Sequence, residues 1–248
     1  MSWGEVTVKK HALKIAHALV ALGLTVLIMQ LLPRLVMHVL SHISSFALML
    51  ESSPFLSVPV ELAVRLGSAL VFIRVLCRGA WASYGFKAKG NLMIEQALMV
   101  GLVIAVAMPL IVSLVMIVGG LDSMRPFIDF PSVLHYVFIG LIFASVTEEI
   151  VFRGLVQSYL SVHISGSLVL FKWQITFPAL IGATFFALGH LSLLTLGLAV
   201  PQVAAIVLGA FILGITAGYL RDETGSLVAP IIIHMLCNAP GILGYLGQ

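Results

Sequence analysis

Residues 133–160 read VLHYVFIGLIFASVTEEIVFRGLVQSYL, a mostly apolar stretch whose charged residues, Glu148, Glu149 and Arg153, lie near its middle. The stretch is longer than the ~20 apolar residues that an α-helix needs to cross a bilayer. A charged side chain in hydrocarbon costs roughly 2.5–3.5 kcal/mol on insertion scales, so it is kept where it is paired or used. We therefore expect a membrane-spanning helix whose acids are candidates for chemistry.

The composition of the whole chain is that of an integral membrane protein. Of its 248 residues, 60% are hydrophobic and 9% charged, and the mean hydropathy is +1.15, whereas about a quarter of the residues of a globular protein are charged. The net charge of +3 does not indicate a nucleic-acid partner, because the basic residues are spread singly between apolar runs. No long linker or internal repeat divides the sequence, so we expect one integral membrane domain over residues 1–248.

Seven runs are long and apolar enough to be spans, which predicts an all-α fold, a polytopic transmembrane helical bundle in the lipid bilayer. The segment 34–53 is more polar and carries His38 and His42 one helical turn apart, so we expect an interfacial or re-entrant helix there. An eighth span in that segment would reverse the orientation of everything after it. The seven expected spans cover residues 13–32, 59–77, 93–118, 133–160, 175–196, 203–220 and 227–246.

Basic residues flank these runs unevenly. With seven spans and a cytoplasmic N-terminus, eight basic residues face the cytoplasm, against Arg34 and Arg125 outside. This is the bias that the positive-inside rule describes. The modest length and the absence of retention or targeting tails favour a bacterial cytoplasmic membrane. The eight residues are Lys9, Lys10, Lys14, Arg78, Lys87, Lys89, Lys172 and Arg221.

The two adjacent acids are expected to have different partners. Glu149 and Arg153 are four residues apart and stack on one helix face, in the order that favours a helical ion pair. Glu148 points about 100° away and remains a free carboxylate. Alternatively, Arg153 snorkels to the cytoplasmic face, or the whole cluster is a structural ion pair between helices.

Two later runs supply further polar residues at helical spacing. Phe186 and His190 lie four apart in the fifth run, and His234 and Asn238 lie four apart in the seventh. At 1.5 Å per residue, Glu148, His190, His234 and Asn238 fall at similar depths from the cytoplasmic side. Polar groups at one depth in the membrane predict a water-filled cavity.

Other patterns concern packing and anchoring. Small residues recur at helical spacing in the fifth and sixth runs and predict close helix approach. The loop 78–90 is basic and aromatic, with Trp81 and Tyr84, and suits an interfacial anchor. The small residues are Ala179, Ala183, Ala187, Gly214 and Gly218.

In this order on separate runs, the motifs Glu148-Glu149-xxx-Arg153, Phe186-xxx-His190 and His234-xxx-Asn238 resemble those of the CPBP glutamic intramembrane proteases, the CAAX prenyl protease and bacteriocin-processing family. The resemblance covers residues 133–248, which we take as the catalytic core, with residues 1–132 as accessory spans. It implies an intramembrane endopeptidase that needs no cofactor and hydrolyses a membrane-associated protein or peptide.

The resemblance also implies a role for each residue of the three motifs. Glu148 would activate a water as general base, and His190 would share or orient that water. His234 and Asn238 would donate hydrogen bonds to the oxyanion. Glu149, Arg153 and Phe186 would support the site.

Three other functions remain open at the sequence level. One carboxylate and two histidines also suit a zinc hydrolase, although the HExxH motif is absent. A transporter could use Glu61, Arg65 and Arg74 in the second run together with Glu148, unless Glu61 and Arg65 pair with each other. A non-catalytic membrane scaffold is the third. No stretch of the sequence specifies an oligomeric state.

Overall fold

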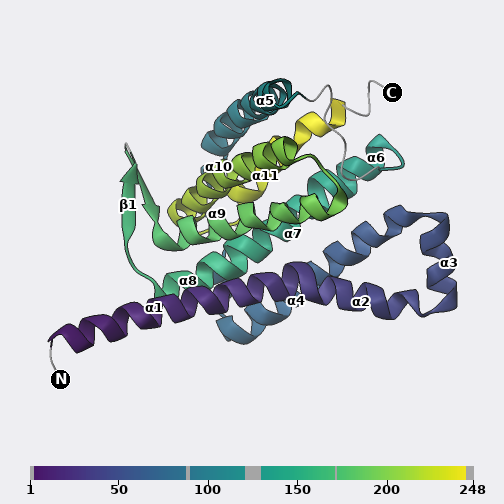
Figure 1. Ribbon diagram of the computed structural model, residues 1–248. Coiled ribbons are helices and arrows are strands. Elements are labelled where there is room, and N and C mark those ends of the chain that lie inside the picture. Colours follow the sequence, from purple (N-terminus) through teal and green to yellow (C-terminus); the bar gives the residue numbers. More distant parts are fainter. Residues whose placement is uncertain (1–2, 88–89, 121–129, 171, 244–248) are drawn as a thin grey trace.

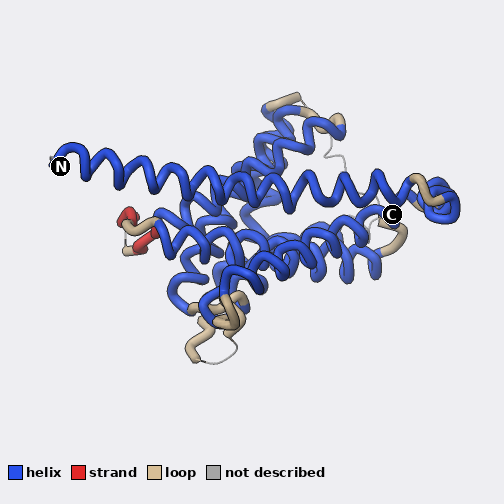
Figure 2. Tube along the Cα trace, turned by 90° about the horizontal axis from the view of Figure 1, so that it is seen from below, coloured by secondary structure: helices blue, strands red, loops and turns tan. Residues whose placement is uncertain are grey.

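The chain folds into a bundle of long helices with one β-hairpin at an end of the bundle (Figure 1). The computed structural model describes residues 3–87, 90–120, 130–170 and 172–243. Lys89, Arg125 and the end of the seventh expected span at residues 244–246 lie outside these residues. Viewed from below, the first helix reaches past the others at its N-terminal end (Figure 2).

The first helical run is longer than expected. Helix α1 (Trp3–Val26), the π-helical turn η1 (Leu27–Leu31) and α2 (Leu32–Ser41) follow one another without a break. The expected end at residue 32 is therefore wrong. Pro33 lies in the first turn of α2, just after η1, and the wider π-helical turn accommodates a proline that would break a regular helix.

The second run returns alongside the first. After α2 come α3 (Ser44–Ser52), the short turn η2 (Pro54–Leu56) and α4 (Ser57–Cys77), and α4 packs against α2. The expected separate helix over 34–53 is thus wrong in its first part, which extends the first run, and only α3 stands apart. Helix α3 has no buried residue. On α4, Arg65 Nη2 lies 3.0 Å from Glu61 Oε2, as expected if these residues simply pair.

The remaining runs agree well with the expected spans. Helix α5 covers Ile94–Val118, and one run joins α6 (Val133–His135), η4 (Tyr136–Phe143), α7 (Ala144–Glu149), η5 (Ile150–Gln157) and α8 (Ser158–His163). Both η4 and η5 are π-helical. The chain continues with α9 (Phe177–Gly189), η6 (His190–Leu196), α10 (Val200–Thr224), α11 (Val228–Asn238) and η7 (Ala239–Ile242).

Five described helical runs are long and apolar enough to cross a membrane. Helix α4, with three charged residues in 21, and the shorter run Val228–Ile242 complete the seven runs that the sequence predicts. The fold is a polytopic transmembrane helical bundle. The five runs are His11–Ser41, Ile94–Val118, Val133–His163, Phe177–Leu196 and Val200–Thr224.

The β-hairpin is a departure from the all-α expectation. Strands β1 (Ser167–Leu170) and β2 (Trp173–Thr176) pair antiparallel. The strands are rich in apolar and β-branched residues, which suit a pleated strand. The fifth span consequently begins at Phe177, after Thr176, whose hydroxyl accepts a hydrogen bond from Ala179 N (3.2 Å) and caps α9.

Helices α9 and α10 approach each other at the predicted small residues. A Cβ added to Gly214 would lie 2.9 Å from Ala183 Cβ, and one added to Gly218 would lie 3.0 Å from Ala179 Cβ. Real Cβ atoms rarely come so close, so the backbones touch here because side chains are missing. The prediction of close helix approach is confirmed.

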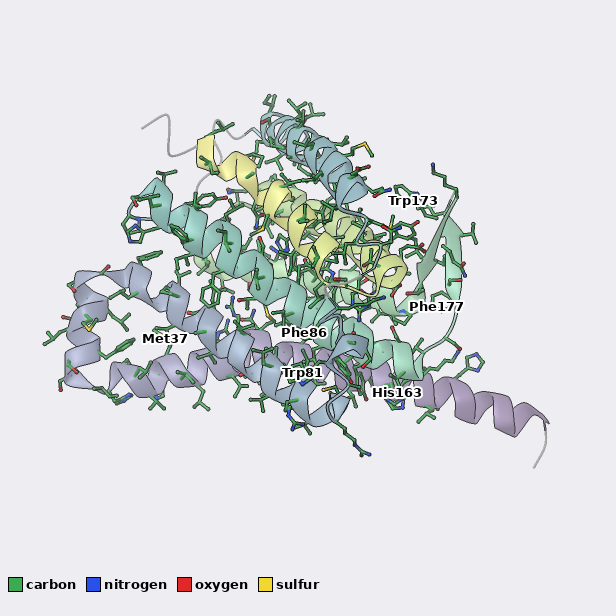
Figure 3. All side chains as sticks on the ribbon, turned by 180° about the vertical axis from the view of Figure 1, so that it is seen from behind. Met37, Trp81, Phe86, His163, Trp173 and Phe177 are labelled. Atoms are coloured by element: carbon green, nitrogen blue, oxygen red, sulfur yellow. The ribbon has the colours of Figure 1, made fainter. Side chains whose placement is uncertain are left out.

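Several of the basic segments lie at one end of the bundle. Lys14 Nζ donates to Ser165 O (3.4 Å), Ser226 Oγ donates to Lys87 O (2.5 Å), and Arg221 Nη2 donates to Ser83 O (2.9 Å). Figure 3 shows Met37 at the opposite end from His163 and Phe177.

The loop 78–90 faces the protein more than expected. Tyr84 is buried in the core, and Leu227 N donates to Gly85 O (3.0 Å). Trp81 packs edge-on against Phe86, and both are labelled in Figure 3. The prediction that Tyr84 anchors the protein in the interface is therefore wrong, because its ring is buried in the helix bundle.

Gly214→Val is expected to destabilise the fold by about 1–3 kcal/mol, the usual cost of overpacking, because its side chain would meet Ala183. Thermal unfolding of the purified protein in detergent measures the change. Gly67→Val is the matched control, since Gly67 is helical with open space around its Cβ position. Equal unfolding temperatures for the two variants would contradict the close packing of α9 on α10.

Candidate active site

Helix α7 carries both acids, in very different surroundings. The side chain of Glu149 is completely buried, whereas that of Glu148 is 19% exposed. The π-helical turns of η5 begin at the next residue, Ile150. Such turns are rare and often mark functional sites. Of the two carboxylates, Glu148 is therefore the one that water can reach.

Glu149 forms the predicted ion pair with Arg153. Arg153 Nη1 donates to Glu149 Oε1 at 2.8 Å, and its Nη2 donates to the carbonyl of Gly214 at 3.0 Å. The guanidinium also lies over the ring of Phe186, 4.9 Å from its centroid. Arg153 is 1% exposed, so the snorkelling alternative is wrong. The Glu149 carboxylate on α7 and the Gly214 carbonyl on α10 therefore pair with the guanidinium of Arg153 inside the bundle.

Glu149 has a second partner that the sequence did not indicate. His234 Nδ1 lies 2.7 Å from the same oxygen, Oε1. A carboxylate only accepts, so Nδ1 carries the proton and donates. This orients His234 Nε2 toward Glu148 Oε2, 3.6 Å away, which is longer than a hydrogen bond. Glu149 thus orients an imidazole as well as pairing with Arg153.

Asn238 is held from two sides. Its Nδ2 donates to Ser145 Oγ at 3.3 Å, and its backbone oxygen accepts from Tyr136 OH at 2.6 Å. Ser145 is fully buried. Sequence reasoning missed both Ser145 and Tyr136. Ser145 lies four residues before Glu149, so its place on the same helix face was the available signal.

The contacts of α7 with α11 form two polar pairs at matching intervals. Ser145 contacts Asn238. Glu149, four residues after Ser145 on α7, contacts His234, which lies four residues before Asn238 on α11. The two helices therefore run antiparallel along this face. The interval of four in each sequence motif is what brings both pairs into register.

His190 packs edge-on against the ring of Phe186. It follows α9 directly, and its Nδ1 donates to Phe186 O at 2.9 Å. In the neutral ring, this leaves the lone pair on Nε2. The Phe186 ring lies 5.0 Å from the ring of His190 and 5.6 Å from that of His234, between centroids. The structure thus brings His234 beside Glu148 and joins His190 to them through an aromatic ring.

The arrangement supplies the parts of a hydrolytic site. Glu148 is a partly exposed carboxylate, His190 carries a nitrogen lone pair, and Asn238 has one amide N–H beyond the one given to Ser145. Within the described ranges, no three His, Cys, Asp or Glu side chains form a group that could hold a metal ion.

The part of the chain that contains this site is similar to a known protein family. Residues 130–240 match the family model described as "Type II CAAX prenyl endopeptidase Rce1-like". No curated protein and no solved structure matches the chain. The matched segment contains all three motifs, from the acids of α7 to Asn238 of α11. Over residues 130–240 the chain is similar to the Rce1-like type II CAAX prenyl endopeptidases, a protease family consistent with the CPBP resemblance.

Proposed function

We propose that the protein is a glutamate-dependent intramembrane endopeptidase in which Glu148 activates the attacking water without a metal ion. The observation that carries the proposal is that the two acids differ in their partners and in their exposure to solvent. Oε1 of Glu149 is shared by Arg153 and His234, while Glu148 is partly exposed beside His234 Nε2. A base must be accessible to water, and Glu148 is the accessible acid.

In the proposed reaction, Glu148 takes a proton from water, and the hydroxide attacks the carbonyl carbon of the scissile peptide bond. His190 Nε2 accepts from the same water and orients it. The C–N bond then breaks, and Glu148 returns the proton to the leaving nitrogen. The first products are a carboxylic acid and an amine, and the proton of the acid then passes to the amine to give a carboxylate and an ammonium group. Glu148 has returned the proton that it took, so the enzyme regains its starting protonation.

The oxyanion would be stabilised from α11. Asn238 donates the N–H of its amide that Ser145 does not use. His234 donates through Nε2, which requires a doubly protonated ring because Nδ1–H is engaged by Glu149. The carboxylate of Glu149 stabilises that imidazolium.

The substrate that fits this site is a membrane-associated protein or peptide. Glu148 and His190 lie on helical runs that are long and apolar enough to cross the membrane, so we expect the scissile bond to be brought to their depth. The name of the matched family points to the carboxyl-terminal CAAX segment of a prenylated chain. A fluorogenic peptide with a prenylated cysteine near its carboxyl terminus is therefore the first substrate to assay.

Glu148→Gln is expected to reduce cleavage of that peptide by about 10²–10⁴-fold, the usual contribution of general base catalysis, because the amide cannot accept the proton from water. Turnover by purified protein in proteoliposomes measures this. Glu51→Gln, on the exposed helix α3, is the matched control and should retain full activity. Full activity of Glu148→Gln would refute the proposal.

Asn238→Ala should lower kcat on the order of 10²–10³-fold, as does loss of an oxyanion donor. Ser145→Ala should lower kcat by a smaller factor with an unchanged KM, because Ser145 orients the Asn238 amide but does not touch the substrate. Ser161→Ala serves as control, since Ser161 is exposed and its hydroxyl donates to Gln157 O, one turn earlier in the same helical run. A change of KM alone in Ser145→Ala would contradict the orienting role.

Treatment with strong chelators is expected to leave cleavage unchanged, because no step of the proposed reaction uses a metal ion. Activity is measured after prolonged dialysis against EDTA and against 1,10-phenanthroline. Loss of activity that returns with added zinc would instead support the zinc hydrolase.

A further inference from the structure

The β-hairpin has one wholly apolar face. Successive side chains of a strand point to opposite faces, and the register pairs Leu168 with Ile175 and Leu170 with Trp173. These four side chains share one face.

The other face is largely polar. It carries Ser167, Val169, Gln174 and Thr176. Gln174 Nε2 donates to Ser167 Oγ (2.9 Å), and Thr176 Oγ1 donates to Asp222 Oδ2 (2.7 Å). The hairpin is therefore amphipathic.

The helix bundle covers only part of the apolar face. Ile175 is buried, and the ring of Trp173 stacks on Tyr219 of α10 at 5.8 Å between centroids. Leu168 and Leu170 remain 51% and 52% exposed, and Trp173 remains 38% exposed. Three large apolar side chains are thus left open beyond the edge of α10.

The open apolar face continues a lipid-exposed stripe of α10. Leu208 and Ile212 are exposed on α10, and Tyr219 follows two helical turns later on the same side. Since α10 is long and apolar enough to span a membrane, we expect this stripe to face hydrocarbon. The contact of Tyr219 with Trp173 carries the apolar surface from the helix onto the hairpin.

The hairpin also lies where the bilayer surface is expected. It stands across the ends of the helices instead of running along them (Figure 1). Lys14 binds the Ser165 carbonyl just before β1, and the exposed Lys172 lies in the turn. Tryptophan beside lysine is typical of the boundary between acyl chains and headgroups.

We propose that the hairpin lies in the membrane interface, with Leu168, Leu170 and Trp173 in the acyl region and Lys172 at the phosphates of anionic phospholipids. Strand β2 leads directly into α9 through the capping residue Thr176. The hairpin therefore anchors the start of α9, the helix that His190 directly follows. This interaction is independent of the proposed peptidase reaction.

The test uses neighbouring positions on opposite faces. In protein with Trp3→Phe, Trp81→Phe and Trp173→Phe, a single tryptophan is introduced by Leu170→Trp or by Val169→Trp. Each protein is placed in vesicles of phosphatidylcholine and phosphatidylglycerol. Quenching by brominated acyl chains and by aqueous iodide is then measured. Protein with only Trp3→Phe and Trp81→Phe reports the same apolar face from the native Trp173, so the test does not depend on a new side chain.

The proposal predicts that the tryptophans at positions 170 and 173 are quenched by brominated lipid and resist iodide. Val169 is 76% exposed. A tryptophan at position 169 should therefore be quenched by iodide several-fold more strongly than one at position 170. Equal iodide quenching at positions 169 and 170 would overturn the proposal, because the hairpin would lie in water. Protection of position 170 from both quenchers would also overturn it, and would indicate that a protein segment covers this face.

Discussion

The buried contact between Glu149 and Arg153 is the interaction on which the rest of the site depends. Both side chains are 1% exposed or less, in a region where an uncompensated charge is costly. The pair persists because each partner has another: Arg153 donates to the Gly214 carbonyl, and Glu149 accepts from His234. One ion pair therefore links α7 to α10 and to α11. The close approach of α9 to α10 occurs at the same glycine.

This arrangement explains why the chain carries two adjacent acids. A single carboxylate could not both neutralise Arg153 and act as a base, because a paired carboxylate inside the bundle is inaccessible to water. Glu149 takes the structural role and, through His234, also sets the geometry beside Glu148. In the proposed reaction, the structural acid thus supports the catalytic one through an imidazole that contacts both.

Local spacing predicted the features that lie within one helix or between regular helix faces. The Glu149–Arg153 pair and the contact of Gly214 with Ala183 both follow from intervals of four. The contact of Glu149 with His234 could not be predicted, because it spans 85 residues and depends on the register of two antiparallel helices. The hairpin was missed because its strands are only four residues long. The first helix continues past its expected end at residue 32, because the π-helical turn Leu27–Leu31 accommodates Pro33, which follows that turn.

The most direct test of this account is a double-mutant cycle on the buried pair, read by unfolding in detergent. Glu149→Gln and Arg153→Met should each cost about 3–5 kcal/mol, because each leaves the other group buried without its charge partner. The double variant should cost clearly less than the sum of the two. If the costs were simply additive, or if either single variant were as stable as the parent, the ion pair would not be what holds the site together.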